Sequence, residues 1–185
     1  VSPVTELNAP QRALPPQLPR ELGVAEVDAM LARLDPQFSG YATLLLSGVS
    51  PYELSLLTPQ SFNADAHAVQ LGGAQPRQIA IQEAAWQQLA STGLLSYDLN
   101  TSLQDIDHQL IHAAAQAQLR EPANCNALAL WHTYVVYLIR QGADSQALAE
   151  RVGGIPPQVL QQLMRDTPVE SVADPDPTYP SLRTA

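Results

Sequence analysis

The most informative stretch of this sequence is residues 44–54, which read Leu-Leu-Leu-Ser-Gly-Val-Ser-Pro-Tyr-Glu-Leu. An apolar run from Tyr41 to Leu46 precedes Gly48, and glycine often marks the point where a regular element turns. Proline is favoured at the first position of a helix, because its φ is already helical and its missing N–H needs no partner there. Pro51 therefore predicts a short helix through Leu57, directly after the turn.

The residues on either side of this stretch predict one further helix and a small sheet. Val24 to Leu34 has its apolar side chains on one helical face. Further along the chain, apolar residues alternate with polar ones on both sides of residues 72–76, Gly-Gly-Ala-Gln-Pro. Alternation with period two is typical of strands, and a glycine-rich connection is typical of a hairpin. We expect a two-stranded antiparallel hairpin from about Ala66 to Ile81 and no β structure after it.

The rest of the chain has apolar residues at helical spacing. The predicted helices cover residues 83–90, 103–119, 127–140, 145–152 and 156–164. Gly142 is the expected C-cap residue of the third of these, and Gly153-Gly154 separates the last two. The expected fold is mainly α with a small antiparallel β-hairpin sheet, in the α+β class.

Length and composition favour one domain with extensions at both ends. A chain of 185 residues with 45% hydrophobic residues is long enough for one ordinary core. Residues 1–20 contain five prolines and few large apolar side chains, so we expect a flexible arm there. Residues 21–165 form the predicted domain. Residues 166–185 are acidic and again rich in proline, which predicts a tail.

The charge of the chain argues against nucleic acid as its partner. Nine Arg and no Lys stand against eighteen acidic residues, which gives a formal net charge of -9. Proteins that bind nucleic acid through its backbone need clustered basic residues, because neutralising phosphates supplies most of the non-specific affinity. No stretch reaches the ~20 apolar residues that span a bilayer, and no secretory leader is evident, so we expect no membrane contact and a cytoplasmic location.

Two histidines are the strongest candidates for a metal or catalytic site of another kind. His108 and His112 lie four residues apart, so on a helix both could face one metal ion, and Asp105 and Asp107 are near. Without a third ligand at fixed spacing, an exposed polar helix face is the better interpretation. An unrelated enzyme that uses His108 and His112 stays open as an alternative, and we expect no cofactor and no metal.

Aromatic residues concentrate in one predicted helix, and the chain has a single cysteine. Trp131, Tyr134 and Tyr137 lie close together in residues 127–140, where packing in the core is favoured over a platform for stacking bases. Cys125 is the only cysteine, which excludes an intramolecular disulfide and a zinc site made of several cysteines. It is best interpreted as a small buried residue.

Taken in order, these segments resemble the catalytic domain of tyrosine recombinases, the phage-integrase and Xer-like family. Residues 44–54 resemble the family's apolar helix, its Thr-Gly-Leu-Arg turn and the Glu-Leu that follows. The other matching segments are 62–65 with 69–81 (the family's hairpin), 130–144 (its His-x-x-Arg-His-Thr box and a helix ending in Gly-Val-Asp) and 147–154 (the helix leading to Leu-Gly-His). The resemblance covers about residues 21–165 and implies the family's catalytic-domain fold.

The resemblance also implies that the family's chemistry is missing. The family uses two Arg, a Lys and His groups to stabilise a pentavalent phosphate, and a Tyr as nucleophile. The matching positions hold Ser50 (first Arg), Gly72 (Lys), Leu128 (box His), Trp131 (second Arg), Gly154 (late His) and Leu163 (Tyr), and only His132 agrees. A shift of the alignment cannot supply a Lys that the chain lacks. We therefore expect no enzymatic activity of this kind.

The favoured hypothesis is a non-catalytic recombinase-like domain that acts as a protein-interaction or regulatory module with an unknown protein partner. The alternative is a DNA-binding accessory of recombination or integration that does not cleave strands. Residues 21–165 contain six Arg and thirteen acidic residues, a net charge of -7, which argues against a duplex as ligand while leaving it open.

Two structural expectations follow from this hypothesis. Trp131 should be largely buried, because an apolar side chain replaces a cation beside an emptied phosphate site. A disordered, solvated end is one expectation for the tail. If the tail is ordered, it should pack Tyr179 or Leu182 against a helical face of its own or another copy, since Val169, Tyr179 and Leu182 are apolar anchors in an acidic, proline-rich segment. The family commonly extends a C-terminal segment onto a neighbouring protomer, so self-association through this tail is a further expectation.

Overall fold

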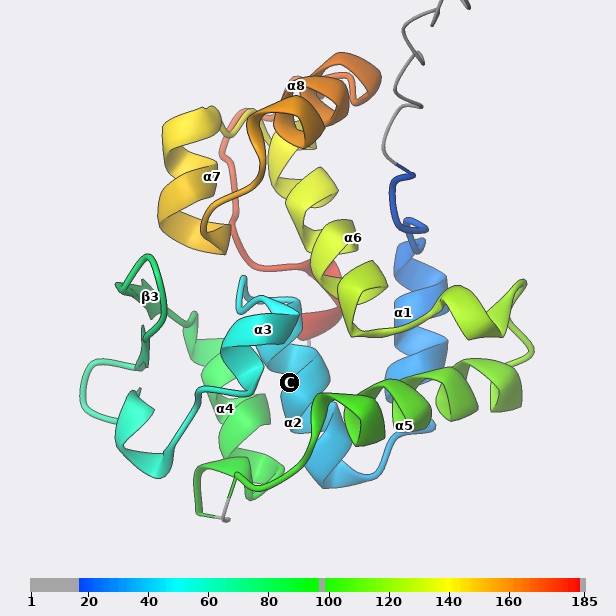
Figure 1. Ribbon diagram of the computed structural model, residues 1–185, viewed down its shortest axis with the longest axis vertical. Helices are drawn as coiled ribbons and strands as arrows, with labels where there is room; N and C mark the ends of the chain where they lie inside the picture. Colours follow the sequence, from blue (N-terminus) through cyan, green and yellow to red (C-terminus); the bar gives the residue numbers. More distant parts are fainter. Residues whose placement is uncertain (1–16, 97–98, 184–185) are drawn as a thin grey trace, which may run out of the picture.

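The computed structural model describes residues 17–96 and 99–183, and they form a mainly helical molecule with one small sheet (Figure 1). The helices are α1 (Val24–Leu31), α2 (Pro36–Leu45), α3 (Pro51–Leu54), α4 (Glu83–Ser91), α5 (Leu103–Gln116), α6 (Ala127–Arg140), α7 (Ser145–Val152) and α8 (Pro157–Asp166). The short 3-10 turns are η1 (Pro59–Ser61), η2 (Leu94–Ser96), η3 (Pro122–Asn124) and η4 (Pro180–Leu182). This confirms the expected fold class.

Helix α2 lies at the centre of the core. All residues from 40 to 49 are buried, and α2 packs against α4, α5 and α6. The apolar run from Tyr41 therefore forms the second half of a helix that begins at Pro36, where proline again occupies the first helical position. Gly48 then turns the chain at φ +111°, a conformation that favours glycine, and α3 follows.

The sheet has three antiparallel strands in the order β1 (Phe62–Asn63), β2 (Ala68–Leu71) and β3 (Arg77–Ala80). Phe62 pairs with Val69, and Val69 pairs in turn with Ile79. The predicted two-stranded hairpin is confirmed in β2 and β3, but it gains a third strand. Two residues are too few to show alternation, so periodicity could not reveal β1, and only the family resemblance had matched residues 62–65 to the hairpin.

Three predicted helices end one turn earlier than expected. Helix α5 was predicted to Leu119 but stops at Gln116, because Gln118 adopts φ +57° and the Leu119 N–H donates to Ala114 O. That pattern closes a helix with a left-handed residue and satisfies a free carbonyl. Helices α1 and α3 likewise stop three residues before their predicted ends, whereas α6 and α7 have their predicted bounds.

The segment after α8 returns along the body of the molecule (Figure 1). It runs past α6 on the side of α7 and ends in η4, which packs against α1 and α4. Tyr179 and Leu182 are only 2% and 1% exposed. The expected packing of these anchors is thus confirmed within the same chain, while Val169 stays 66% exposed and does not serve as an anchor.

Candidate functional site

Three of the positions matched to catalytic residues line one hollow between α3 and the sheet. Ser50, Gly72 and Gly154 surround a cavity of about 340 Å³. Ser50 is the N-cap of α3: its Oγ accepts a hydrogen bond from the Glu53 N–H at 3.3 Å and donates to Glu53 Oε1 at 2.6 Å. The hydroxyl therefore holds the start of a helix.

Arg77 is the one cation among the nine residues that line this hollow, and its charge is already compensated. Its Nη1 lies 2.6 Å from Glu53 Oε2, and its Nη2 donates to Gly48 O at 2.9 Å. The two charged side chains are only 11% and 10% exposed. A guanidinium held in this way offers little net positive charge to a phosphate.

Two glycines lie against residues that line this hollow, and one of them, Gly154, lines it directly. A Cβ at Gly153, whose φ is +83°, would lie 2.7 Å from Arg77 Nη1. A Cβ at Gly154 would lie 2.9 Å from Gln75 Oε1. Arg77 and Gln75 thus occupy the space that side chains at these two positions would need.

The remaining matched positions lie in a second hollow between α6 and α8. Leu128, Trp131, His132 and Leu163 line an apolar cavity of about 180 Å³. Gly154 lines the first hollow, while the next two residues, Ile155 and Pro156, line the second, so the two cavities are neighbours along the chain. The structure therefore brings the matched positions together in two adjacent groups.

Trp131 and His132 differ in how far they are buried. His132 is 5% exposed, and burial lowers its pKa below the usual value, although the charge of Glu21 acts in the opposite direction. Trp131 is only partly buried and packs against the core, with an inaccessible Nε1 that has no hydrogen-bond partner. The prediction of a largely buried Trp131 is therefore met only in part, and Leu128, which lines the same cavity, is 45% exposed.

His108 and His112 lie on the exposed face of α5, as expected for a polar helix surface. His112 Nε2 is 3.0 Å from Gln116 Nε2, and the Asp105 carboxylate accepts from the Ser102 hydroxyl at 2.7 Å. Asp107 accepts from the Ala127 N–H at 2.8 Å, so it joins α5 to α6. Within residues 17–96 and 99–183, no group of three or more metal-ligating side chains is arranged to hold an ion.

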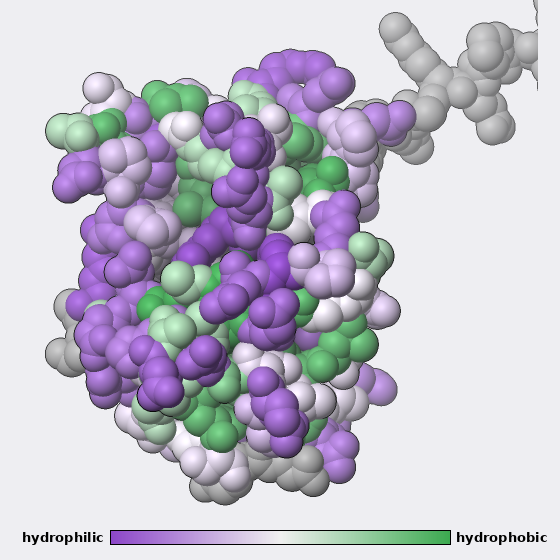
Figure 2. Space-filling model, turned by 90° about the vertical axis from the view of Figure 1, so that its left-hand side faces the viewer, coloured by the Kyte–Doolittle hydropathy of each residue, from purple (hydrophilic) through white to green (hydrophobic). Residues whose placement is uncertain are grey.

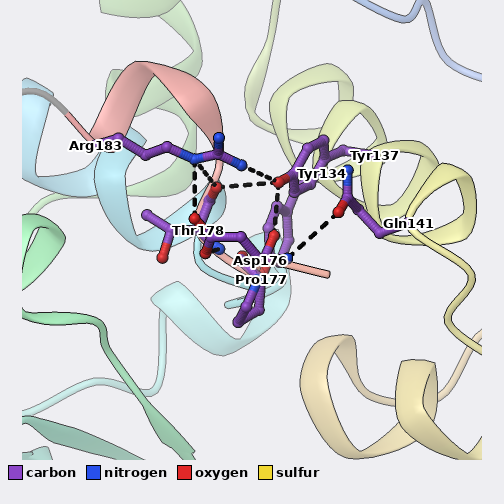
Figure 3. Close-up of polar contacts among 7 residues, drawn as sticks. All are labelled: Tyr134, Tyr137, Gln141, Asp176, Pro177, Thr178 and Arg183. Carbon is purple, nitrogen blue, oxygen red and sulfur yellow. Dashed lines mark hydrogen bonds and ion pairs between the residues drawn. The ribbon is translucent and has the colours of Figure 1, made fainter. Parts of the chain in front are cut away.

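The largest cluster of polar contacts is one that the sequence did not reveal, between α6 and the tail (Figure 3). Tyr134 Oη donates to Pro177 O at 2.6 Å, and Tyr137 Oη lies 2.6 Å from Asp176 O and 3.1 Å from Thr178 O. Arg183 closes the cluster by donating to Tyr137 Oη at 2.6 Å. Burial is the main cause of the raised pKa of both tyrosines. The concentration of aromatic residues in this segment was the sequence signal for the cluster, but we interpreted it as packing in the core alone.

Most arginines in the described chain form contacts with other groups of the same chain. Of eight, five contact groups of the chain itself: Arg20 with Glu26, Arg77 with Glu53, Arg140 with Glu21, Arg183 with Asp176, and Arg151 with Tyr134 Oη. The exposed Arg33, Arg120 and Arg165 form no ion pair with the described residues. Figure 2 shows the face of the sheet and α7, where hydrophobic residues form separate patches among hydrophilic ones.

The geometry defines a class of fold, that of the catalytic domains of tyrosine recombinases. One solved structure with this fold is that of XerA recombinase, with a TM-score of 0.66 and 19% identity over 85% of this chain and 63% of that chain. Another is the XerH site-specific recombinase bound to difH substrate in a pre-cleavage complex, with a TM-score of 0.63 and 16% identity over 80% of this chain and 51% of that chain. No protein-family model and no curated protein matches the sequence.

The chain therefore shares a fold with these recombinases and spans about half to two thirds of their length. Likeness of fold does not carry chemistry with it, because one fold can host many functions. Among the described residues, no helix has the length and apolar character needed to cross a bilayer.

Proposed function

We propose that this chain is a non-catalytic domain of the tyrosine-recombinase fold that acts as a protein-interaction or regulatory module. The observation that carries the proposal is the hollow beside Ser50. Its one cation, Arg77, is bound to Glu53 and Gly48, and the matched positions Gly72 and Gly154 add no side chain that could bind phosphate.

The second hollow supports the same proposal. Phosphoryl transfer through a covalent intermediate needs a nucleophile and donors aimed at the developing charge. Leu163, at the position matched to the Tyr nucleophile, is 3% exposed and has a hydrocarbon side chain. Trp131, at the position matched to the second Arg, contributes an indole ring. Loss of one such donor typically lowers the rate by ~10²–10³, and here several are replaced together.

The charge distribution favours a protein partner over DNA. Three arginines remain exposed without an ion pair in the described chain: one lies in α8, one in the segment after α5 and one in the segment after α1. Dispersed single charges do not form the basic stripe that binds a duplex. The DNA-binding accessory thus remains the alternative that the first experiment must test.

That experiment is a titration of the full chain with a labelled random-sequence DNA duplex at about 50 to 200 mM salt. We expect no saturable binding and no covalent protein–DNA adduct. Binding with a steep negative salt slope would establish the DNA-binding alternative instead. Trp131→Arg serves as a matched variant: it restores a cation next to His132 but should yield no adduct, because Leu163 still supplies no nucleophile.

A further inference from the structure

The cavity between α6 and α8 is left unfilled by the described chain. It measures about 180 Å³, whereas one water molecule takes ~30 Å³ in the liquid. Its walls are almost wholly apolar and include Val135 of α6, Ile155 and Pro156 before α8, and Val159 and Leu163 of α8. Voids of this size are few in close-packed protein interiors, so the cavity is a candidate binding site.

Helix α8 is not tightly packed against the rest of the molecule. Its apolar residues include Val159, Leu160 and Leu163, but Leu163 alone is fully buried. A second cavity, of about 220 Å³, lies between Leu160 and residues of α7. Within residues 17–96 and 99–183, none of the closely packed pairs of elements includes α8. A small shift of this helix to admit a molecule therefore breaks no tight interface.

One polar side chain on the wall of the cavity lacks a partner. His132 is only 5% exposed, and no described residue forms a hydrogen bond with its imidazole. Burial lowers the pKa of this ring, so at neutral pH it is uncharged, with one N–H donor and one bare nitrogen acceptor. A buried polar group without a hydrogen bond is unfavourable, and a ligand that supplies the bond removes that cost.

The size and the walls of the cavity define the ligand. An apolar protein cavity of ~150 Å³ binds benzene, so this space fits one six-membered ring with a small substituent. Leu128 and Trp131, which also line it, are partly exposed and leave a path from the solvent. A hydroxyl both donates and accepts, so it satisfies the imidazole in either tautomer. A charged substituent would lose its hydration in these surroundings and is disfavoured.

We propose that the cavity between α6 and α8 binds an uncharged single-ring molecule of the phenol class, whose hydroxyl forms a hydrogen bond with His132 and whose ring packs between the two helices. The inference goes beyond the proposed interaction role and does not depend on it. A bound ring fills the space under α8 and so couples a small ligand to the position of that helix.

The test is a titration of the full, isotope-labelled chain with phenol, followed by NMR through the indole N–H signals of its two tryptophans. Trp131 lines the cavity, whereas Trp86 stacks on His67 and does not line it. We expect a saturable shift of the Trp131 signal while the Trp86 signal stays in place, and Trp131→Phe assigns the two signals. A shift that does not saturate, or equal shifts of both signals, would overturn the proposal.

A matched variant tests the hydrogen bond. Toluene has the shape of phenol with a methyl group in place of the hydroxyl, and His132→Leu replaces the imidazole with a side chain of similar size that cannot form a hydrogen bond. The ratio of phenol affinity to toluene affinity should fall by about fivefold or more in this variant, which is the effect of one net hydrogen bond. An unchanged ratio would show that His132 does not bind the hydroxyl and would contradict the proposal.

Two further measurements locate the ligand. Val159→Phe fills the cavity from α8 and should abolish the shift of the Trp131 signal by phenol and toluene alike. In the unchanged chain, nuclear Overhauser effects should join the ring protons of phenol to the methyl groups of Val135 and Leu163, so the test does not require any variant to fold. Their absence at saturation would place phenol elsewhere and refute the site. None of these outcomes alters the titration with DNA, so failure here leaves the proposed function unchanged.

Discussion

The hollow beside Ser50 and the contact between α6 and the tail each contain an arginine that pairs with an acid, but the two pairs differ in exposure. Arg77 and Glu53 are 11% and 10% exposed, and Gly153 closes around the guanidinium. Arg183 and Asp176 are 43% and 44% exposed, at a distance of 3.1 Å. Water can replace the second pair at little cost, whereas it solvates the first pair much less because both side chains are mostly buried. The Arg77–Glu53 pair is therefore a fixed part of the fold, whereas the polar contacts between α6 and the tail can open.

The comparison has one complication, because the tail also carries anchors that are as deeply buried as the core. Tyr179 and Leu182 belong to the same hydrophobic cluster as α2 and α6. The contact between α6 and the tail thus combines exposed polar groups, which can separate easily, with two buried side chains, which keep the tail bound. The following experiments separate these contributions, from the largest expected effect to the smallest.

Removal of the tail should have the largest effect. A chain truncated after Arg165 loses both buried anchors, and each large side chain removed from a core costs ~3–5 kcal/mol. We expect the free energy of unfolding to fall by about 5 kcal/mol or more, measured by urea denaturation. Truncation after Arg183 is the control and should match the full chain. If the two truncated chains are equally stable, the anchors do not contribute to the core.

Breaking the buried ion pair should rank second. Glu53→Ala leaves the mostly buried Arg77 without its carboxylate, and an unpaired buried charge costs up to ~3–5 kcal/mol. Arg77→Ala combined with Glu53→Ala should recover part of that loss, since no lone charge remains. Equal stability of the single and double variants would show that water solvates the unpaired Arg77 guanidinium. The contrast in burial with the Arg183–Asp176 pair would then be wrong.

Trp131→Ala should cost less, about 2 kcal/mol, because Trp131 is only partly buried and a fully buried Trp would cost ~3–5 kcal/mol. Thermal melting followed by circular dichroism measures the change. Leu128→Ala on the exposed side of the same hollow is a suitable control and should shift the melting temperature by a smaller amount. A shift as large as that for the buried ion pair would indicate that the second hollow is closed in solution.

Acid should weaken the domain through His132. Burial lowers the pKa of this imidazole below its ordinary value of 6.5, so the unfolded chain takes up a proton at a higher pH than the folded chain does. This stability is fully present above about pH 6.5 and is lost progressively as the pH falls from there towards the folded pKa. The His132→Gln chain should show a smaller drop in melting temperature between about pH 7.5 and pH 5. Identical pH profiles of the two chains would assign the acid sensitivity to other groups.

Arg183→Gln should have the smallest effect on stability, below about 1 kcal/mol, because exposed ion pairs contribute little. Its effect should instead appear in hydrogen exchange, where the amide of Thr178 becomes less protected while α6 is unchanged. Loss of protection throughout α6 would show that the polar contacts between α6 and the tail do not open independently of the helix.

The sequence by itself determined the fold class and most of the helices. Apolar residues at helical spacing predicted every helix after residue 83, because burial of one face imposes that period whatever the partner is. The bounds of α6 were predictable, since Asn126 caps its start and Gly142 follows its end with φ +91°. The matched positions from Ser50 to Leu163 could also be named from the sequence, because they follow ordered motifs.

Only the tertiary structure decided which of these residues meet. Nothing in the spacing places Arg77 against Glu53, or divides Ser50 and Leu163 between two neighbouring hollows, because such contacts join segments far apart along the chain. The same holds for the tail. Its apolar anchors were visible in the sequence. The packing of α6, however, determines that the hydroxyls of Tyr134 and Tyr137 form hydrogen bonds with the backbone of the tail. Local patterns report which face of an element is buried, and the fold alone determines what that face is buried against.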